Sequence, residues 1–306
     1  MLQSQIVQPR SRPKSHGEAV RLQQDTTNQG GRQGLIRITQ QHIAPPIVRF
    51  GLVQQPHPIE LHQQFQHGLD LQRIRFQSCC QAFSTQVASR CHDISVHPQQ
   101  PLALFVGRRP GTESYLIDCR DGRLLQTLRT PADRHFYGHA VFHKDGEWLY
   151  STENDTREPG RGVLGVWRLN NGQLQRHSEL STHGIGPHQL LWLPDGETLV
   201  VANGGIRTEA DSREATNLNA MESSLVLLGR DGTLFSRERL ANPLNSIRHL
   251  AVAADGTIAC GQQYQGDPSD AVPLLAVKRP GQALQEFSVA SAQLQAMQQY
   301  CASLAI

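Results

Sequence analysis

A histidine that recurs four times, each time at the start of a short apolar run, most constrains how this 306-residue chain can fold. The four copies begin at His92, His139, His188 and His249. In the last three copies, an Asp-Gly pair follows the apolar run, at Asp145-Gly146, Asp195-Gly196 and Asp255-Gly256. Asp-Gly between two apolar runs predicts a tight turn joining antiparallel strands.

Each copy continues with two further apolar runs, separated by a variable polar loop and by another turn. The later turns fall at Asp121-Gly122, Asn171-Gly172, Asp231-Gly232 and Pro280-Gly281. Four strands per unit, repeated at roughly 50 residues, are typical of β-propeller blades. The longest interval predicts an insertion on a loop at 207–221. We therefore predict an all-β fold, an incomplete propeller over residues 89–306 with about four blades.

The two ends of the chain differ from these repeats. Residues 1–88 are rich in glutamine, lack Trp and Tyr, and show no sustained period. Such a segment buries too little apolar surface to order its backbone, so we predict disorder or a non-native N-terminus. A local strand is indicated at 47–53. At the other end, Ser303-Leu-Ala-Ile306 resembles the start of a further blade.

Composition removes several classes of partner. The formal charge of +2 creates no field that attracts nucleic acid. No apolar run is long enough for a transmembrane helix, so we expect no membrane insertion. The N-terminus lacks the pattern of a signal peptide, and the chain as written is therefore cytoplasmic. Six cysteines without a C-x-x-C pair indicate incidental thiols.

Six motifs in the repeat region resemble a bacterial family called domain of unknown function 1513. They are Arg134–Phe142, Thr152–Asp155, Gly160–Val166, His183–His188, Val201–Ile206 and Ser246–Val252. The resemblance implies a WD40-like or YVTN-like propeller that is exported to the periplasm, often encoded near imelysin-type iron-uptake proteins. It assigns no activity. Relative to that family, the chain is truncated at both ends.

The repeated histidines are the first candidates for chemistry. Because the opening strand of a propeller blade lies nearest the axis, the four imidazoles are expected to meet in one central cavity. There they can bind a transition metal or an anion. We take His139, His188 and His249 as candidate ligands of a divalent metal. The alternative is that such a histidine hydrogen-bonds to neighbouring strands and fixes the blade.

Polar residues on the surrounding loops are candidates for a ligand pocket on the axial face, for a small ligand or a protein partner. The set comprises Arg134, His135, Tyr137, His139, Glu153, Asn154, Asp155, His183, His188, Asn203, Arg248 and His249. Carboxylate and amide oxygens in Glu153-Asn154-Asp155 are what a hard cation such as Ca²⁺ accepts. The alternative for this run, and for Asn203-Gly-Gly, is turn chemistry alone.

No catalytic signature accompanies these residues: the sequence has no G-x-S-x-G, Walker loop or H-E-x-x-H. The leading hypothesis is a non-enzymatic binding or scaffold protein, in a periplasmic iron-acquisition system as the resemblance implies. A second hypothesis is a lactonase-like or quinoprotein-like enzyme in which Glu153 and Asn203 hold a divalent cation. A third is an inactive gene fragment.

Overall fold

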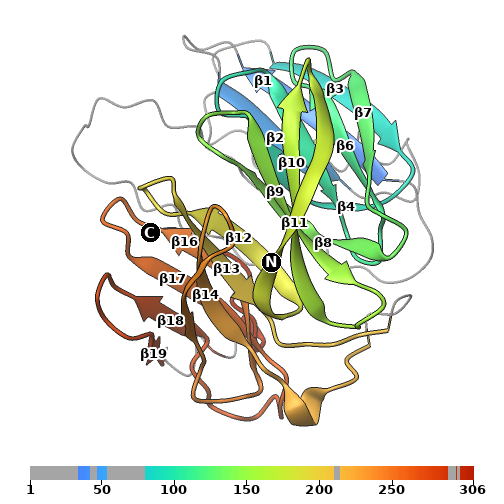
Figure 1. The fold of residues 1–306 in the computed structure, drawn as a ribbon. Helices are drawn as coiled ribbons and strands as arrows, with labels where there is room; N and C mark the ends of the chain where they lie inside the picture. The colour runs from blue at the N-terminus through green and yellow to red at the C-terminus, as the bar shows by residue number, and fades with distance from the viewer. Residues whose placement is uncertain (1–33, 42–46, 54–79, 210–213, 289–293, 295–296) are drawn as a thin grey trace.

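The computed structural model describes residues 34–41, 47–53, 80–209, 214–288, 294 and 297–306 (Figure 1). Strands dominate this part of the chain, and one 3-10 helix, η2 (Leu218–Ala220), lies in the predicted insertion loop. Within the described residues, no helix has the length and apolar character needed to cross a membrane.

Each predicted repeat forms one four-stranded antiparallel sheet. The first sheet contains β4 (Cys91–Val96), β5 (Leu102–Gly107), β6 (Glu113–Asp118) and β7 (Leu124–Arg129). The second contains β8 (Arg134–Phe142), β9 (Trp148–Asp155), β10 (Arg161–Asn170) and β11 (Gln173–Ile185). The third contains β12 (Pro187–Trp192), β13 (Thr198–Asn203), β14 (Ser224–Gly229) and β15 (Leu234–Glu238). The fourth contains β16 (Asn245–Val252), β17 (Ile258–Tyr264), β18 (Leu275–Lys278) and β19 (Gln285–Phe287).

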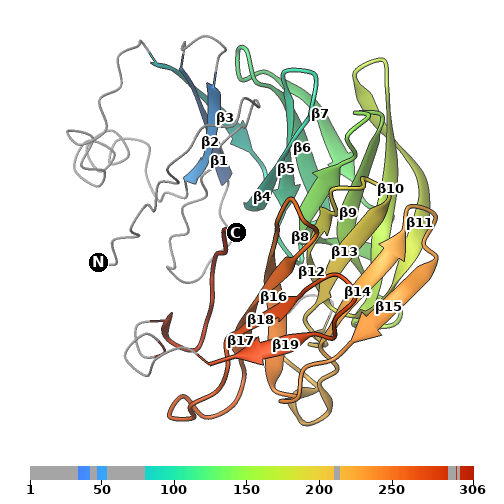
Figure 2. The same cartoon turned by 90° about the vertical axis from the view of Figure 1, so that its left-hand side faces the viewer.

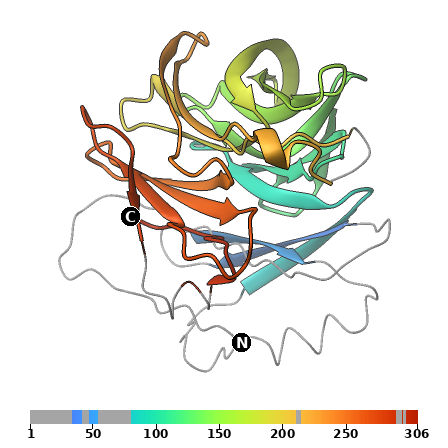
Figure 3. The same ribbon diagram turned by 90° about the horizontal axis from the view of Figure 1, so that it is seen from below.

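The strands of each of these four sheets pair in chain order, which confirms the predicted blades of a partial propeller. The opening strands are neighbours in space, because β8 packs against both β4 and β12, and β12 packs against β16. Figure 3 shows the four sheets following one another around a common centre. The opening strand of each sheet is therefore the innermost one.

Apolar side chains fill the spaces between successive sheets. One core joins Leu104 and Leu116 of the first sheet to Phe136 and Trp167 of the second. Two similar cores join the second sheet to the third and the third to the fourth. This packing explains why strands such as β5 read as nearly continuous apolar runs, since a sheet with a neighbour on each side buries both of its faces.

The Asp-Gly turns adopt the backbone that the sequence predicts, with φ of +76° at Gly146, +70° at Gly196 and +84° at Gly256. Two of these turns receive a histidine from the preceding sheet. His97 Nε2 donates to the carbonyl of Gly146 at 2.9 Å, and His143 Nε2 donates to that of Gly196 at 2.8 Å. These two histidines, which follow the repeated ones in the chain, thus connect neighbouring blades. The repeated His139 also bonds to the neighbouring blade, through Asp93 of β4.

A separate three-stranded sheet precedes the repeats. It contains β1 (Gly34–Gln41), β2 (Ile47–Val53) and β3 (Cys80–Val87), in the order β2-β1-β3. The strand predicted at 47–53 is therefore present. Figure 2 shows this sheet beside β4 of the first blade. Most of the glutamine-rich segment, for which disorder was predicted, lies outside the described residues.

The C-terminal residues pack on the fourth sheet. Tyr300 forms a β-bridge with Gln263, and the backbone N–H of Cys301 donates to the carbonyl of Gln262 at 2.9 Å. Residues 301–306, where a further blade was expected to start, carry no strand in this structure. Within the described residues, no strand pairs with 302–306, and the segment before them attaches to β17 through Tyr300 and Cys301.

We predict that His143→Ala lowers the free energy of unfolding by about 1–3 kcal/mol, because it leaves the buried Gly196 carbonyl without a donor. Urea denaturation followed by tryptophan fluorescence measures this change. His177→Ala is the control, since His177 is exposed and should change stability by less than about 0.5 kcal/mol. Equal losses in the two variants would contradict the assigned role.

Candidate functional site

The four repeated imidazoles lie together at the centre of the four sheets. Ring centroids are 4.9 Å apart for His92 and His139, 4.6 Å for His139 and His188, and 5.0 Å for His188 and His249. His139, His188 and His249 are buried and His92 is half-buried. One short histidine-initiated motif, repeated in sequence, has therefore produced one cluster in space.

A register break beside each histidine helps to aim its ring. The pairing of every inner strand with its neighbour is interrupted at Cys91/Asp93, Phe136/Ala140, Pro187/Leu190 and Ile247/His249. An extra residue in one strand bends it and turns a side chain away from the regular alternation. The breaks thus recur where the chain presents its imidazoles to the centre.

Gly138 provides the space that the His92 ring fills. Its φ is +111°, and a Cβ at this position would lie 2.5 Å from Cδ2 of His92. Any side chain at this position would therefore both strain the backbone and displace the ring. The close approach of His92 to His139 depends on this glycine.

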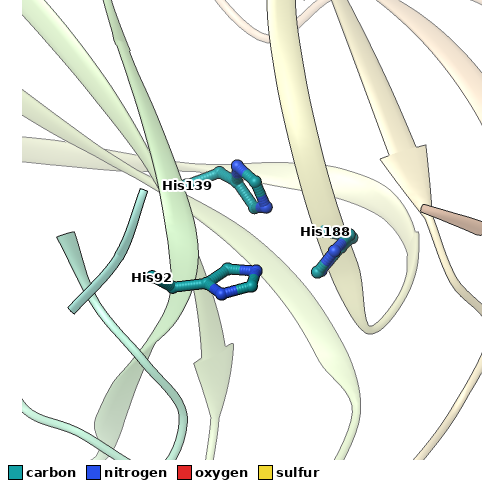
Figure 4. Close-up of side chains that lie close together, drawn as sticks. All are labelled: His92, His139 and His188. Carbon is teal, nitrogen blue, oxygen red and sulfur yellow. The ribbon is translucent and has the colours of Figure 1, made fainter. Parts of the chain in front are cut away.

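Three ring nitrogens, one each from His92, His139 and His188, lie within 4.8 Å of one another (Figure 4). His139 Nδ1 is 2.6 Å from Oδ2 of Asp93. Because an ionised carboxylate only accepts, this bond places a proton on Nδ1 and leaves the lone pair of the neutral ring on Nε2. Nε2 of His139 and Nε2 of His188 are buried and have no hydrogen-bond partner among the described residues.

Burial disfavours the protonated forms of His92, His188 and His249. It lowers the pKa of His188 and of His92 well below the ordinary value, and the charge of neighbouring His139 lowers both further. Burial likewise lowers the pKa of His249 to about 3, with a further contribution from His139. His249 Nε2 also lies 2.6 Å from the hydroxyl of Tyr300. Neutral imidazole is the form that coordinates metals.

A family model described as "Protein of unknown function (DUF1513)" matches residues 85–306. The chain belongs to this family. No curated protein matches it. Among solved structures, hydrazine synthase of Kuenenia stuttgartiensis is 14% identical with a TM-score of 0.51, and the match covers 68% of this chain and 56% of that one. A functionally unknown protein from Desulfotomaculum acetoxidans DSM 771 is 15% identical with a TM-score of 0.46, covering 67% and 56%.

The similarity to hydrazine synthase concerns the fold alone and does not assign an activity. The chain spans about half of the length of the solved structures that it matches, 56% in both cases. The activity must therefore be argued from the site itself.

Three predicted ligand residues, Arg134, Glu153 and Asp155, lie in a charge network of the second sheet. Arg134 pairs with Asp155 at 3.0 Å and with Glu179 at 2.8 Å. Burial opposes ionisation of Asp155, but hydrogen bonds from Arg157 and Arg161 outweigh it, and the pKa of Asp155 falls below its ordinary value. Arginine nitrogens thus surround the carboxylate that the Ca²⁺ hypothesis requires.

The other two acceptors of this run have protein partners as well. Oε1 of Glu153 accepts from Arg176 at 2.8 Å and from Ser151 at 2.7 Å. Burial nevertheless raises the pKa of Glu153. Oδ1 of Asn154 accepts from the backbone N–H of Gly160 at 3.0 Å. These contacts fit the alternative in which the run holds its own turn.

The remaining predicted residues divide between the centre and the loops. Arg248 precedes His249 on β16, and its charge contributes to the low pKa of His188. Tyr137 accepts a hydrogen bond from Arg109. Burial, with the charge of Arg109, lowers the pKa of His135.

Two predicted residues bind the backbone of the neighbouring sheet, His183 from the second sheet and Asn203 from the third. His183 has a φ of +51°, and its Nε2 lies 3.4 Å from the carbonyl of Gly232. Nδ2 of Asn203 donates to the carbonyl of Thr182 at 3.1 Å, and the Oδ1 of Asn203 is buried without a partner among the described residues. The structure therefore brings His139, His188, His249 and Arg248 together, with Tyr137 close enough to act on Arg248. Arg134, Glu153, Asn154 and Asp155 instead bond within the second sheet, and His183 and Asn203 bond to the neighbouring sheet.

We predict that Gly138→Ala is more destabilising than Gly172→Ala. Both glycines have positive φ, and alanine there costs roughly 1–2 kcal/mol from the backbone alone. A Cβ at Gly172 meets nothing within 4 Å, whereas one at Gly138 collides with His92. Chemical denaturation of both variants measures the free energy of unfolding, and the difference between the two variants reports the collision with His92. An equal loss of stability in both would show that His92 moves aside freely.

We also predict that the metal-free protein loses stability as the pH falls from about 6.5. The unfolded histidines take up protons there, whereas burial keeps His188, His92 and His249 neutral in the folded state. The unfolded state thus binds more protons, and each histidine contributes at most about 1.4 kcal/mol per pH unit. Urea denaturation with a chelator at pH 7.5 and 5.5 measures the slope.

The control for this pH dependence is a pair of variants. His188→Asn removes one of the buried imidazoles and should flatten the slope, while exposed His177→Ala should keep it. Equal stability of the unmodified protein at the two pH values would mean that the buried imidazoles are protonated in the folded state.

Proposed function

We propose that the DUF1513 protein is a binding protein that holds a transition-metal ion at the centre of its propeller, through His92, His139 and His188. One observation carries this proposal. Three imidazole nitrogens face one another within 4.8 Å, and two buried ring nitrogens have no partner among the described residues. A buried polar atom without a partner costs free energy, and a bound metal ion recovers that cost.

The donor set indicates the class of ion. Imidazole suits Zn, Cu, Fe and Ni, and a hard cation such as Ca²⁺ prefers oxygen ligands. A metal–nitrogen bond of about 2.0–2.1 Å requires ligand nitrogens closer together than 4.8 Å. Rotation of the rings about their side-chain bonds brings them to that distance. His249 lies 5.0 Å from His188 between ring centroids and is the candidate fourth ligand.

Asp93 acts as a positioning residue in this proposal. Its carboxylate holds His139 Nδ1 at 2.6 Å and so turns Nε2 toward the other rings. A carboxylate behind a ligating histidine fixes the ring and raises its basicity.

The structure favours binding over the enzymatic alternative. That alternative uses Glu153 and Asn203 to hold the cation. Glu153, however, pairs with Arg176 at 2.8 Å, and Asn203 donates to the Thr182 carbonyl at 3.1 Å. Glu153 therefore bonds within its own sheet, and Asn203 joins its sheet to the neighbouring one. The four imidazoles, by contrast, share one space.

The family resemblance extends the proposal to the cellular location of the protein and to the identity of the metal ion. It implies a periplasmic protein of an iron-acquisition system, in which iron is the physiological metal. Imidazole ligands are compatible with iron. Competition between Fe²⁺ and Zn²⁺ for the purified protein under anaerobic conditions, together with fractionation of cells that produce it, tests both parts of this extension.

We predict that the chelator-treated protein binds one transition-metal ion, and that His139→Ala or His188→Ala weakens binding at least 100-fold. Isothermal titration with Zn²⁺, and the absorption spectrum of the Co²⁺ form, measure affinity and coordination. Asp93→Asn should weaken binding about 10- to 100-fold, because it removes the carboxylate that orients His139.

The exposed His177→Ala variant is the matched control and should bind as the unmodified protein does. The proposal fails if the protein binds none of the ions in stoichiometric amount. It also fails if the His139 and His188 variants remain folded and bind metal with unchanged affinity.

A further inference from the structure

Arginine side chains gather beside the four imidazoles. Arg90 precedes β4, Arg108 and Arg109 follow β5, and Arg248 lies on β16 next to His249. Burial and the charges of Arg90, Arg109 and Arg248 lower the pKa of Arg108 to about 10. The charges of Arg108 and Arg90 also act on His92, and that of Arg248 acts on His188. These arginines therefore share one region with the imidazole cluster.

Carboxylate partners are lacking for two of these arginines. Among the described residues, no ion pair involves Arg108 or Arg248, although many other arginines form one, such as Arg134, Arg161 and Arg176. The Nε of Arg248 is buried and has no hydrogen-bond partner in the same part of the chain. Burial lowers the pKa of Arg248, and the charge of Arg109 adds to that effect. The positive charges of Arg108 and Arg248 are therefore not balanced by an ion pair within the described residues.

Asp93, the acid closest to the imidazoles, is already engaged. Its Oδ2 lies 2.6 Å from His139 Nδ1. The Asp93 carboxylate is therefore already bonded to a histidine. In the part of the chain that the structure describes, Arg108 and Arg248 therefore have no acid that forms an ion pair with them.

Two tyrosines add hydroxyl groups to this region. Tyr137 accepts a hydrogen bond from Arg109, whose guanidinium lies 4.8 Å from the centre of the Tyr137 ring. The hydroxyl of Tyr300 lies 2.6 Å from His249 Nε2. Both tyrosines act electrostatically on Arg248. Guanidinium and hydroxyl groups together are the donors that recognise oxyanions.

We propose that Arg108 and Arg248, with Arg90, Arg109 and the hydroxyls of Tyr137 and Tyr300, form a binding site for a multivalent oxyanion of the carboxylate or phosphate class. Like charges that are partly buried repel each other, and a bound anion removes that repulsion. The planar guanidinium donates two parallel bonds to carboxylate or phosphate. Because Arg108 and Arg248 form no ion pair among the described residues, the matching ligand carries more than one negative charge. This proposal does not rest on the metal site.

Isothermal titration of chelator-treated protein at low ionic strength tests the proposal, with citrate, inorganic phosphate and acetate as separate probes at matched ionic strength. We expect citrate or phosphate to bind at least 10-fold more tightly than acetate. The tighter of the two then identifies the source of the anion as a polycarboxylate or a phosphate. Binding of neither above the level of acetate overturns the proposal. Because no metal is present, this result is independent of the metal titration.

Two variants locate the anion. Arg248→Gln and Arg108→Gln should each weaken binding of the preferred anion at least 10-fold. Arg168→Gln should leave it unchanged, since the exposed Arg168 pairs with Glu147 at 3.7 Å instead. If Arg248→Gln does not fold, Arg108→Gln carries the test. Unchanged binding in the folded Arg108→Gln and Arg248→Gln variants overturns the proposal.

The melting temperature of the anion-free protein gives a second readout. Removing one charge from a group of mutually repelling arginines should leave the melting temperature of Arg108→Gln equal to or above that of the unmodified protein. The preferred anion should raise the melting temperature of the unmodified protein more than that of the variant. A clear drop for Arg108→Gln without anion would show that Arg108 stabilises the fold and would contradict the assignment.

Discussion

The placement of one strand of every sheet beside the same axis is the constraint on which the rest of the structure depends. Because β4, β8, β12 and β16 are the innermost strands, a residue that recurs at one position of these strands meets its own copies. Copies of one residue that are far apart in the sequence are therefore close together in space, and no other feature of the sequence is needed to bring them there. The four imidazoles at the centre follow from this geometry, as do the apolar cores that lie between successive sheets.

Much of the fold could be predicted because its determinants are local. Asp-Gly turns and alternating runs specify hairpins over a few residues, and the repeat joins them into sheets. The register breaks beside the histidines could not be predicted, since they depend on pairing between strands. Nor could the arginine cluster: Arg108 and Arg248 are far apart in the sequence, and no repeat links them. Only packing of the first and fourth sheets around one centre relates them.

The two groups of histidines show the same limit of prediction from the sequence. His92 and His97, like His139 and His143, occupy one strand and its end, and composition cannot tell their roles apart. The difference lies in what faces each ring. His97 and His143 meet a backbone carbonyl of the next blade, whereas His139 and His188 meet other imidazoles. Arg134 and Arg248 differ in a similar way. Arg134 lies beside the carboxylates of Asp155 and Glu179, whereas Arg248 forms no ion pair among the described residues.

The bonds from His97 and His143 have a consequence for how the centre can move. They fasten the first sheet to the second and the second to the third, whereas the corresponding positions before the next turns hold Leu193 and Ala253, which cannot donate from a side chain. His92, His139 and His188 therefore sit on three sheets that are tied together, and His249 sits on the sheet that lacks this tie. Contacts of another kind join this fourth sheet to the third: the Leu250 N–H donates to Oε1 of Gln189 at 2.8 Å, and Ser246 Oγ donates to the Gly204 carbonyl at 2.7 Å. Displacing His249 relative to the other three imidazoles therefore requires these contacts to break.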